Sequence, residues 1–380
     1  MKRSIFEPEH EQFRETARTF FEKECVPHVD EWEKKGNTGK EVWRKAGRQG
    51  LLGWEVPEEF GGQGIRDFRF NAIMNEEYWL SGSVGVGFAL QNDIIAPYFI
   101  ELTTDEQKRR WLPGFVSGEL ITALAMSEPG AGSDVRNIRT TATRDGDHYV
   151  INGSKTFISN GLLSDLVMVA CKTDPSAGHR GISLIVVEAG TPGFTKGRKL
   201  DKIGQHSADT SELHFEDVRV PVENLVGEEN KGFYQLMRNL PKERLGIAVH
   251  SVASSRRAFN LTLEYARERE AFGQSIGKFQ VNRHALAEMQ TKIEVMQTYV
   301  DQCIVKVNSG ELTSEEAAGA KWWTTETQWE ILDRCLQLYG GYGYMNEYEI
   351  ARMWRDARVQ RVYGGTNEIM KDLIGRSMGF

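Results

Sequence analysis

Cysteine is scarce in this chain, and the few cysteines are scattered. The 380 residues include four, Cys25, Cys171, Cys303 and Cys335, and none forms a Cys-x-x-Cys pair. This spacing offers no Cys-x-x-Cys motif, and it favours free thiols in a reducing compartment over disulfides. The eight histidines show no metal-like spacing either, so we expect no metal site.

Long apolar runs and a surplus of positive charge are also missing. The strongest apolar stretches, such as 166–171 and 182–189, are far shorter than the roughly 20 residues that a membrane span needs. Acidic residues stand near the N-terminus where a signal peptide needs an apolar run. The net charge of −7 leaves no basic surplus to neutralise the phosphates of a nucleic acid. We therefore expect a cytoplasmic enzyme that binds no nucleic acid and has no integral membrane segment.

What the chain does have is a hydrophobic periodicity that changes twice. Residues 1–120 show helical spacing, and Thr104 to Gln107 has the form of a capping box. Residues 121–228 alternate short β-rich runs with turn residues, which is typical of an all-β barrel or sandwich. Long helical patterns return over 229–380 and favour an antiparallel bundle. The predicted fold class is mainly α with a β middle domain.

The stretch "LAMSEPGAGSDV", residues 124–135, is the most distinctive part of the β segment. Pro129, Gly130 and Gly132 predict a tight turn directly after a strand. Such a turn exposes backbone N–H groups, and Ser133 adds a hydroxyl. Both suit a ligand that carries carbonyl or phosphate groups, although the turn alone is equally compatible with an ordinary surface loop.

Four further stretches accompany this turn: "KTFISNG" at 155–161, "REAFG" at 269–273, "QLYGGYGYM" at 337–345 and "VYGGTNE" at 362–368. Together, and in this order, they resemble the acyl-CoA dehydrogenase family over nearly the whole chain. The similarity is greatest to the long-chain branch, with isovaleryl-type enzymes next. The resemblance implies a helical domain, a β-barrel and a four-helix bundle. It also implies FAD as cofactor, a homotetramer, and electron transfer flavoprotein as the electron acceptor.

The same resemblance implies which residues contact the flavin. Met126 and Ser127 match main-chain contacts to its pyrimidine edge, Phe157 lies where the dimethylbenzene end is covered, and Ser159 matches a hydroxyl at N5. Ser133 matches a residue at the pyrophosphate and acyl-CoA side. The remaining positions that match FAD contacts, several of them generally supplied by a neighbouring subunit, are Arg269, Phe272, Gln280, Gln337, Gly340, Gly341, Thr366 and Glu368.

The catalytic base is the point at which this chain departs from much of the family. Many members carry a glutamate where this sequence has Gly364, and a glycine cannot take a proton. In the long-chain and isovaleryl branches the base instead precedes an arginine on a helix, and the matching pair here is Glu243 and Arg244. The resemblance therefore implies Glu243 as base and Arg244 near the 3′-phosphate end of CoA. It places Gly364 and Gly365 at the substrate, with the Gly364 N–H donating to the thioester oxygen.

Pro241 adds a local prediction from the residues themselves. Proline lacks an N–H group and restricts the residue before it, so we expect the helix to kink or to begin anew at 241. Glu243 would then stand in the first turn of the helix that follows.

The predicted function is FAD-dependent α,β-dehydrogenation of a long straight-chain acyl-CoA to the trans-2-enoyl-CoA. A branched short-chain, isovaleryl-type dehydrogenase is an alternative, and so is an oxidase-like enzyme or one that acts on a carrier-protein thioester. A third reading is a flavin- or acyl-CoA-binding protein that has lost its base. Glu243 distinguishes that last reading from the first two.

Overall fold

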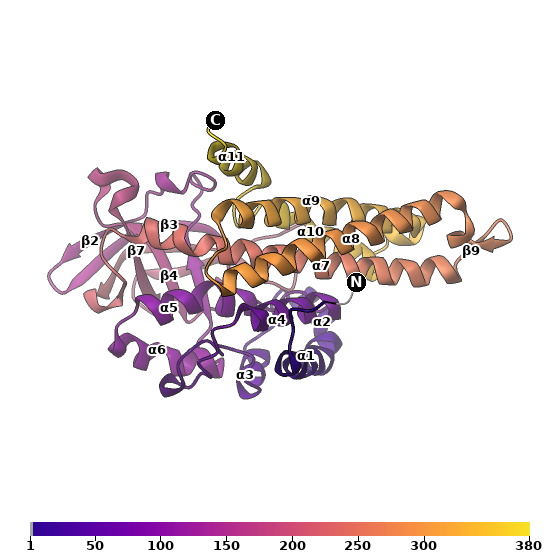
Figure 1. The fold of residues 1–380 in the computed structure, drawn as a ribbon. Coiled ribbons are helices and arrows are strands. Elements are labelled where there is room, and N and C mark those ends of the chain that lie inside the picture. The colour runs from indigo at the N-terminus through magenta and orange to yellow at the C-terminus, as the bar shows by residue number, and fades with distance from the viewer. Residues whose placement is uncertain (1–2) are drawn as a thin grey trace.

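Helical, β and helical segments follow one another along the chain, as the periodicity predicts (Figure 1). The computed structural model describes residues 3–380. Thr104 caps the last N-terminal helix, and its Oγ1 accepts a hydrogen bond from the Gln107 N–H at 3.3 Å, so the capping box is confirmed. The N-terminal α-helices are α1 (Pro8–Phe20), α2 (Val29–Lys35), α3 (Glu41–Arg48), α4 (Phe68–Ser81), α5 (Ala96–Leu102) and α6 (Asp105–Ser117).

The middle segment forms one curved sheet with strand order β6-β7-β3-β2-β4-β5-β8, and β1 pairs in parallel with β4. One face of the sheet encloses an apolar core to which β1 to β7 contribute, with Tyr149, Ile151, Val169 and Phe215 among its buried residues. The expected β domain is therefore a rolled sheet with β6 and β8 at its edges. The strands are β1 (Thr122–Ala125), β2 (Thr141–Asp145), β3 (His148–Ser159), β4 (Leu166–Lys172), β5 (Ile182–Glu188), β6 (Phe194–Lys199), β7 (Thr210–Pro221) and β8 (Leu225–Val226).

Long helices make up the C-terminal segment, and three of them run side by side away from the sheet (Figure 1). A small hairpin of β9 (Glu270–Ala271) and β10 (Gln274–Ser275) lies at their far end. The apolar faces of these helices meet in one core that includes Leu245, Val249, Ile293 and Leu332. The helices are α7 (Gly232–Glu268), α8 (Gln280–Asn308), α9 (Ser314–Leu338), α10 (Glu349–Ala357) and α11 (Asn367–Ser377).

Two alternatives were expected at Pro241, a kink or a new helix, and the second of them is wrong. α7 runs through Pro241 without interruption, and Glu243 lies well inside the helix, away from its first turn. A proline removes one helical hydrogen bond. Before Pro241, Phe233 and Leu236 are buried in the core shared with α5, α6 and the sheet, and after it Leu245 and Ala248 are buried in the core of the bundle. This burial on both sides outweighs the single lost bond.

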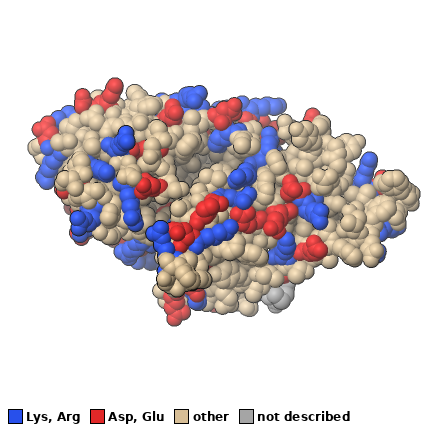
Figure 2. Space-filling view, turned by 90° about the horizontal axis from the view of Figure 1, so that it is seen from above, with Lys and Arg blue, Asp and Glu red and all other residues tan. Residues whose placement is uncertain are grey.

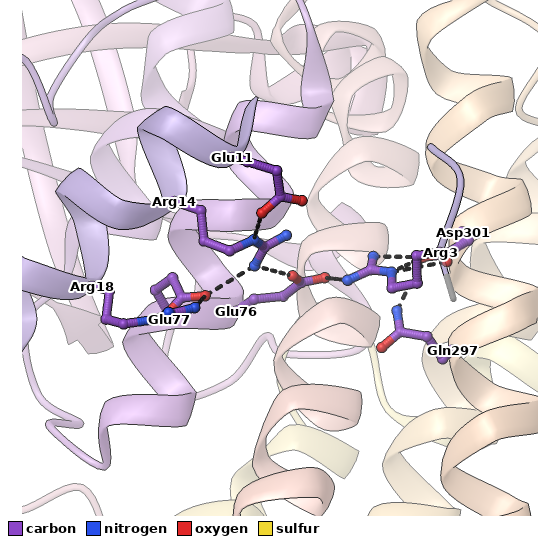
Figure 3. Close-up of polar contacts among 8 residues, drawn as sticks. All are labelled: Arg3, Glu11, Arg14, Arg18, Glu76, Glu77, Gln297 and Asp301. Atoms are coloured by element: carbon purple, nitrogen blue, oxygen red, sulfur yellow. Dashed lines mark hydrogen bonds and ion pairs between the residues drawn. The ribbon is translucent and has the colours of Figure 1, made fainter. Parts of the chain in front are cut away.

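A chain of alternating charges joins the N-terminal helices to the bundle (Figure 3). Arg3 binds Asp301 at 2.6 Å and Glu76 at 2.7 Å. Arg14 bridges Glu76 and Glu77 at 2.8 and 2.9 Å. Arg18 binds the other oxygen of Glu77 at 3.0 Å. We call this set the charge ladder: Arg3, Arg14, Arg18, Glu76, Glu77 and Asp301.

The remaining surface and core features match the composition. All four cysteines are buried free thiols, as expected. On the face seen in Figure 2, Lys and Arg are interspersed with Asp and Glu, and the end of the bundle is mostly uncharged. None of the helices in the described part of the chain combines the length and the apolar character that crossing a bilayer requires.

Candidate active site

The two predicted flavin segments of the middle domain are held together by a buried lysine. Lys155 on β3 donates to the carbonyl of Met126 at 3.0 Å and to Glu128 Oε1 at 2.8 Å. The N–H of Thr156 donates to the carbonyl of Ser127 at 3.0 Å. Sequence reasoning missed Lys155 and Glu128. A lysine followed by an apolar β-rich run was the available signal.

The strand that carries the second segment is irregular where the predicted contacts lie. The pairing of β3 with β7 shifts register between Lys155 and Ile158. Phe157 has a φ of 60° and is 70% exposed, and Ser159, two residues on, is also exposed. Because both side chains are exposed, an aromatic surface and a hydroxyl lie uncovered two residues apart. Ser133 is exposed in its own turn.

The helix that carries Glu243 contacts the glycine turn, although the two segments are far apart in sequence. Arg244 Nε donates to the carbonyl of Gly364 at 3.2 Å. A Cβ atom on Gly364 would lie 2.4 Å from Cδ1 of Ile247, one turn after Glu243. Gly364 and Gly365 have φ angles of 67° and 93°, which favour glycine. Thr366 caps α11 directly after this turn, and Glu368 is exposed in its first turn.

One oxygen of the Glu243 carboxyl group, Oε1, is enclosed by the protein and makes no ion pair with the described residues. The residue is only partly buried as a whole, but Oε1 is shielded from solvent and has no hydrogen-bond partner among residues 3–380. Burial raises the pKa of Glu243 to about 7, whereas Arg244 and the Tyr98 hydroxyl act in the opposite direction. A carboxyl group with a pKa near neutrality is suited to take a proton from a weak carbon acid.

A second buried carboxyl group lies behind Glu243. Asp93 accepts hydrogen bonds from Asn71 Nδ2 at 2.8 Å and from Asn75 Nδ2 at 2.6 Å. Burial raises the pKa of Asp93 to about 6, and its charge contributes to the raised pKa of Glu243. Sequence reasoning did not identify Asp93, Asn71 or Asn75, because helical periodicity gave no reason to bring these polar residues together.

The other predicted cofactor residues gather at the far end of the bundle. The Arg269 guanidinium lies 5.6 Å from the centre of the Tyr342 ring. Phe272 is 96% exposed in the hairpin. Gly340 and Gly341 follow α9, and no atom lies within 4 Å of a Cβ placed on either. Gln280 begins α8, and Gln337 is exposed near the end of α9.

One chain does not bring this distal group to Glu243. Continuous helix joins residues 243 and 268, which at 1.5 Å per residue is a separation of roughly 38 Å. The predicted site residues of the C-terminal segment therefore divide into those at the Glu243 helix and the glycine turn, and a distal set around Arg269. A single small cofactor in one chain cannot contact both.

Comparison with known proteins accounts for the whole chain. Models of the acyl-CoA dehydrogenase N-terminal, middle and C-terminal domains match residues 7–119, 123–218 and 230–379. The mitochondrial long-chain specific acyl-CoA dehydrogenase of Sus scrofa is 49% identical, with 99% of this chain and 88% of that protein covered. The mitochondrial isovaleryl-CoA dehydrogenase of Pongo abelii is 36% identical, with 97% and 88% covered.

Solved structures agree. A crystal structure of an acyl-CoA dehydrogenase from Geobacillus kaustophilus is 50% identical, with a TM-score of 0.97 and 99% of each chain covered. A glutaryl-CoA dehydrogenase from Mycobacterium smegmatis, solved in complex with FADH2, is 25% identical, with a TM-score of 0.91 and coverage of 99% of this chain and 95% of that one.

Proposed function

The chain belongs to the acyl-CoA dehydrogenase family, and from this premise we propose that it oxidises long straight-chain acyl-CoA to trans-2-enoyl-CoA with Glu243 as the base. The observation that carries the proposal is the contact of the Glu243 helix with the glycine turn. The chain thereby retains a buried carboxyl group next to the position at which many members supply theirs. This argues against a binding protein that has lost its base.

The enzyme uses FAD, and the residues present fit this cofactor. The exposed Phe157 ring and Ser159 hydroxyl, beside the fixed main chain of Met126 and Ser127, offer a surface for the isoalloxazine ring. Thr366 and Glu368 lie next to the glycine turn and are proposed to contact the same ring system. When bound, FAD accepts the β-hydrogen of the substrate as a hydride.

The distal set fits the ADP half of a flavin that is held mainly by another copy of the chain. Arg269 offers a planar fork of donors to a pyrophosphate, and the open space above Gly340 and Gly341 allows a cofactor to approach the backbone. Gln280, Gln337 and Phe272 complete this set. The separation of roughly 38 Å from Glu243 supports an oligomer, for which we propose the homotetramer.

In the proposed reaction the Glu243 carboxylate takes up the α-proton of the acyl chain and becomes a carboxylic acid. The thioester oxygen accepts a hydrogen bond from the Gly364 N–H, and this bond strengthens as negative charge develops on the oxygen. One such donor is worth on the order of 10²–10³ in rate. Ser133, Gly365 and Arg244 are proposed to contact the substrate, and Arg244 already holds the Gly364 carbonyl.

The long-chain reading is favoured over the isovaleryl-type alternative by the identities of 49% and 36% to the two curated relatives. Electron transfer flavoprotein is the proposed acceptor. The predicted cytoplasmic location stays a prediction, and the names of both relatives place those proteins in mitochondria.

The test is anaerobic bleaching of the purified holoenzyme by a panel of thioesters, from C4 to C18 acyl-CoA with isovaleryl-CoA and isobutyryl-CoA. We expect the fastest bleaching with long straight chains. The Glu243→Gln variant should keep its yellow colour and bind these thioesters, but lose about 10³-fold or more in bleaching rate, since a positioned base contributes 10²–10⁴.

The matched control is Glu264→Gln, which changes an exposed glutamate on the same helix and should bleach like the unaltered enzyme. Bleaching at the unaltered rate by Glu243→Gln would rule out the assigned base. Preferential bleaching by isovaleryl-CoA would replace the long-chain assignment by the branched one.

A further inference from the structure

A second helix reaches the glycine turn through a buried lysine that the proposed reaction does not use. Lys321 on α9 has no exposed surface. Its Nζ donates to the carbonyl of Gly365 at 2.8 Å and to Asn367 Oδ1 at 2.9 Å. Both acceptors are uncharged oxygens, and no ion pair of Lys321 is found within residues 3–380. The structure thus buries a lysine against a backbone turn without an ionic partner.

Two cationic side chains hold successive carbonyl groups of the turn. Arg244 of α7 binds the carbonyl of Gly364, and Lys321 of α9 binds the carbonyl of Gly365. Helix α9 makes a second contact with this region: Thr325, one turn after Lys321, accepts a hydrogen bond from Asn367 Nδ2 at 2.9 Å. The turn and the start of α11 are therefore fixed from both helices.

This fixing matters because of the residues in the turn. Gly364 and Gly365 both have positive φ angles, and two successive glycines have little intrinsic preference for one conformation. A donor that stabilises a developing charge must be held within about 0.5 Å and 10–20° of its productive orientation. The glycines cannot supply that precision themselves, so it has to come from the groups that bind their carbonyls.

We propose that Lys321 is a positioning residue for the thioester: by holding Gly365 and Asn367 it keeps the Gly364 N–H directed at the thioester oxygen. This inference rests on the proposed function, because it gives Lys321 a role only if Gly364 is the donor. Burial without an ionic partner is energetically unfavourable for an ammonium group. The pKa of Lys321 is accordingly lowered to about 7, chiefly by burial and then by the nearby Arg244, whereas Glu368 and Glu326 act in the opposite direction.

The test uses the holoenzyme and a 3-thiaacyl-CoA. The sulfur atom at position 3 of this probe carries no hydrogen, so no hydride can leave, but Glu243 can still remove the α-proton. The enolate beside oxidised flavin gives a long-wavelength absorption band, and titration of this band with pH reports how well the thioester oxygen is stabilised. Catalysis is followed in parallel with a long-chain acyl-CoA.

The Lys321→Met variant replaces the lysine by a side chain of similar length that donates no hydrogen bond. In this variant we expect the apparent pKa of the bound probe to rise by about one unit or more. This corresponds to about tenfold weaker stabilisation of the enolate. We expect kcat to fall about 10- to 100-fold, within the range of a lost oxyanion donor, with KM changed less than about threefold. Lys292→Met is the control, because it removes an exposed lysine that pairs with Glu330 of the same α9 helix.

An unchanged probe pKa and an unchanged kcat in folded Lys321→Met would overturn the proposal. If that variant does not fold, Thr325→Val decides. It removes the hydroxyl that hydrogen-bonds to both Oδ1 and Nδ2 of Asn367 and leaves Lys321 in place. We therefore expect a smaller shift in the same direction, and unaltered behaviour would overturn the role. A Glu243→Gln variant that still forms the band would instead show that the proposed base is wrong, which separates the two failures.

Discussion

Two sets of buried charged residues in this molecule differ in the groups that bind them. In the charge ladder each guanidinium binds a carboxylate, and Glu76 and Glu77 each receive two arginines (Figure 3). At the glycine turn beside the Glu243 helix, Arg244 and Lys321 bind backbone carbonyls instead, and Glu243 Oε1 has no hydrogen-bond partner within the described part of the chain. These two side chains fix the backbone and leave the carboxylate free to react.

The pKa shifts of Arg3 and Glu243 show the same difference between the charge ladder and the candidate active site. The carboxylates of the ladder raise the pKa of Arg3 despite its burial, so folding stabilises the charged form. Burial raises the pKa of Glu243 to about 7, so folding disfavours its charge at neutral pH. A buried charge with ionic partners on both sides serves the fold, whereas a buried charge that the fold disfavours indicates chemistry.

The largest expected effect is in the ladder. Glu77→Ala removes the carboxylate that Arg14 and Arg18 share. Because Arg14 keeps Glu76 and the Arg18 side chain is 46% exposed, we expect a loss of about 3 kcal/mol, the low end of the range for breaking a buried ion pair. Urea unfolding would measure the change in the free energy of unfolding. Glu15→Ala is the matched control: Glu15 is exposed and lies 3.8 Å from Arg18, so we expect a loss below about 1 kcal/mol. Equal losses in both variants would contradict the structural role given to the ladder.

Whereas removal of the Glu77 carboxylate is expected to destabilise the protein, removal of the Glu243 carboxylate is expected to stabilise it at neutral pH, and this effect depends on pH. Its pKa is about 7 in the folded protein against an ordinary value of 4.5, so the folded state binds more protons between these values. The contribution of Glu243 to stability is therefore present below pH 4.5 and is lost as the pH rises through 7. Each unit of pKa is worth about 1.4 kcal/mol.

The Glu243→Gln variant does not titrate at this position. Its stability relative to the unaltered protein should therefore increase by about 2–3 kcal/mol between pH 5 and pH 8, as measured by urea unfolding at both values. The other titrating groups are shared by both proteins and cancel in the difference. A relative stability that is the same at both pH values would mean that Glu243 is solvated like a surface carboxylate, and the contrast with the ladder would then disappear.

Sequence predicted the parts of this site that are local and missed those that depend on packing. The three-part order and the capping box at Thr104 followed from periodicity and cap chemistry. The contact between the Glu243 helix and the Gly364 turn is not local, and it was expected only from the family resemblance. The continuity of α7 through Pro241 did not, because local proline rules omit the burial that holds the helix on both sides. Lys321 and Lys155 were missed for a related reason: a lone lysine in an apolar run reads as a solvated side chain until tertiary contacts show what it binds.

The smallest expected effect concerns the second position for the base. A glutamate at 364 in the Glu243→Gln background could approach the same α-carbon, but its Cβ would lie 2.4 Å from Ile247 Cδ1, and the φ of 67° is unfavourable for a residue with a side chain. Ile247→Val removes that Cδ1 atom at a cost of about 0.5–1.5 kcal/mol.

We therefore expect Glu243→Gln with Gly364→Glu to recover little bleaching, and the further change Ile247→Val to raise the recovered rate about tenfold, equivalent to about 1.4 kcal/mol in the barrier. Glu243→Gln with Ile247→Val alone is the control and should recover none, because it supplies no new carboxylate. If the control recovers as much as the triple variant, the glutamate at 364 is not acting as the base. If neither the triple variant nor the control recovers bleaching while all variants stay yellow, a glutamate at 364 does not reach the α-carbon. The base must then be supplied from α7, as Glu243 supplies it in the unaltered enzyme.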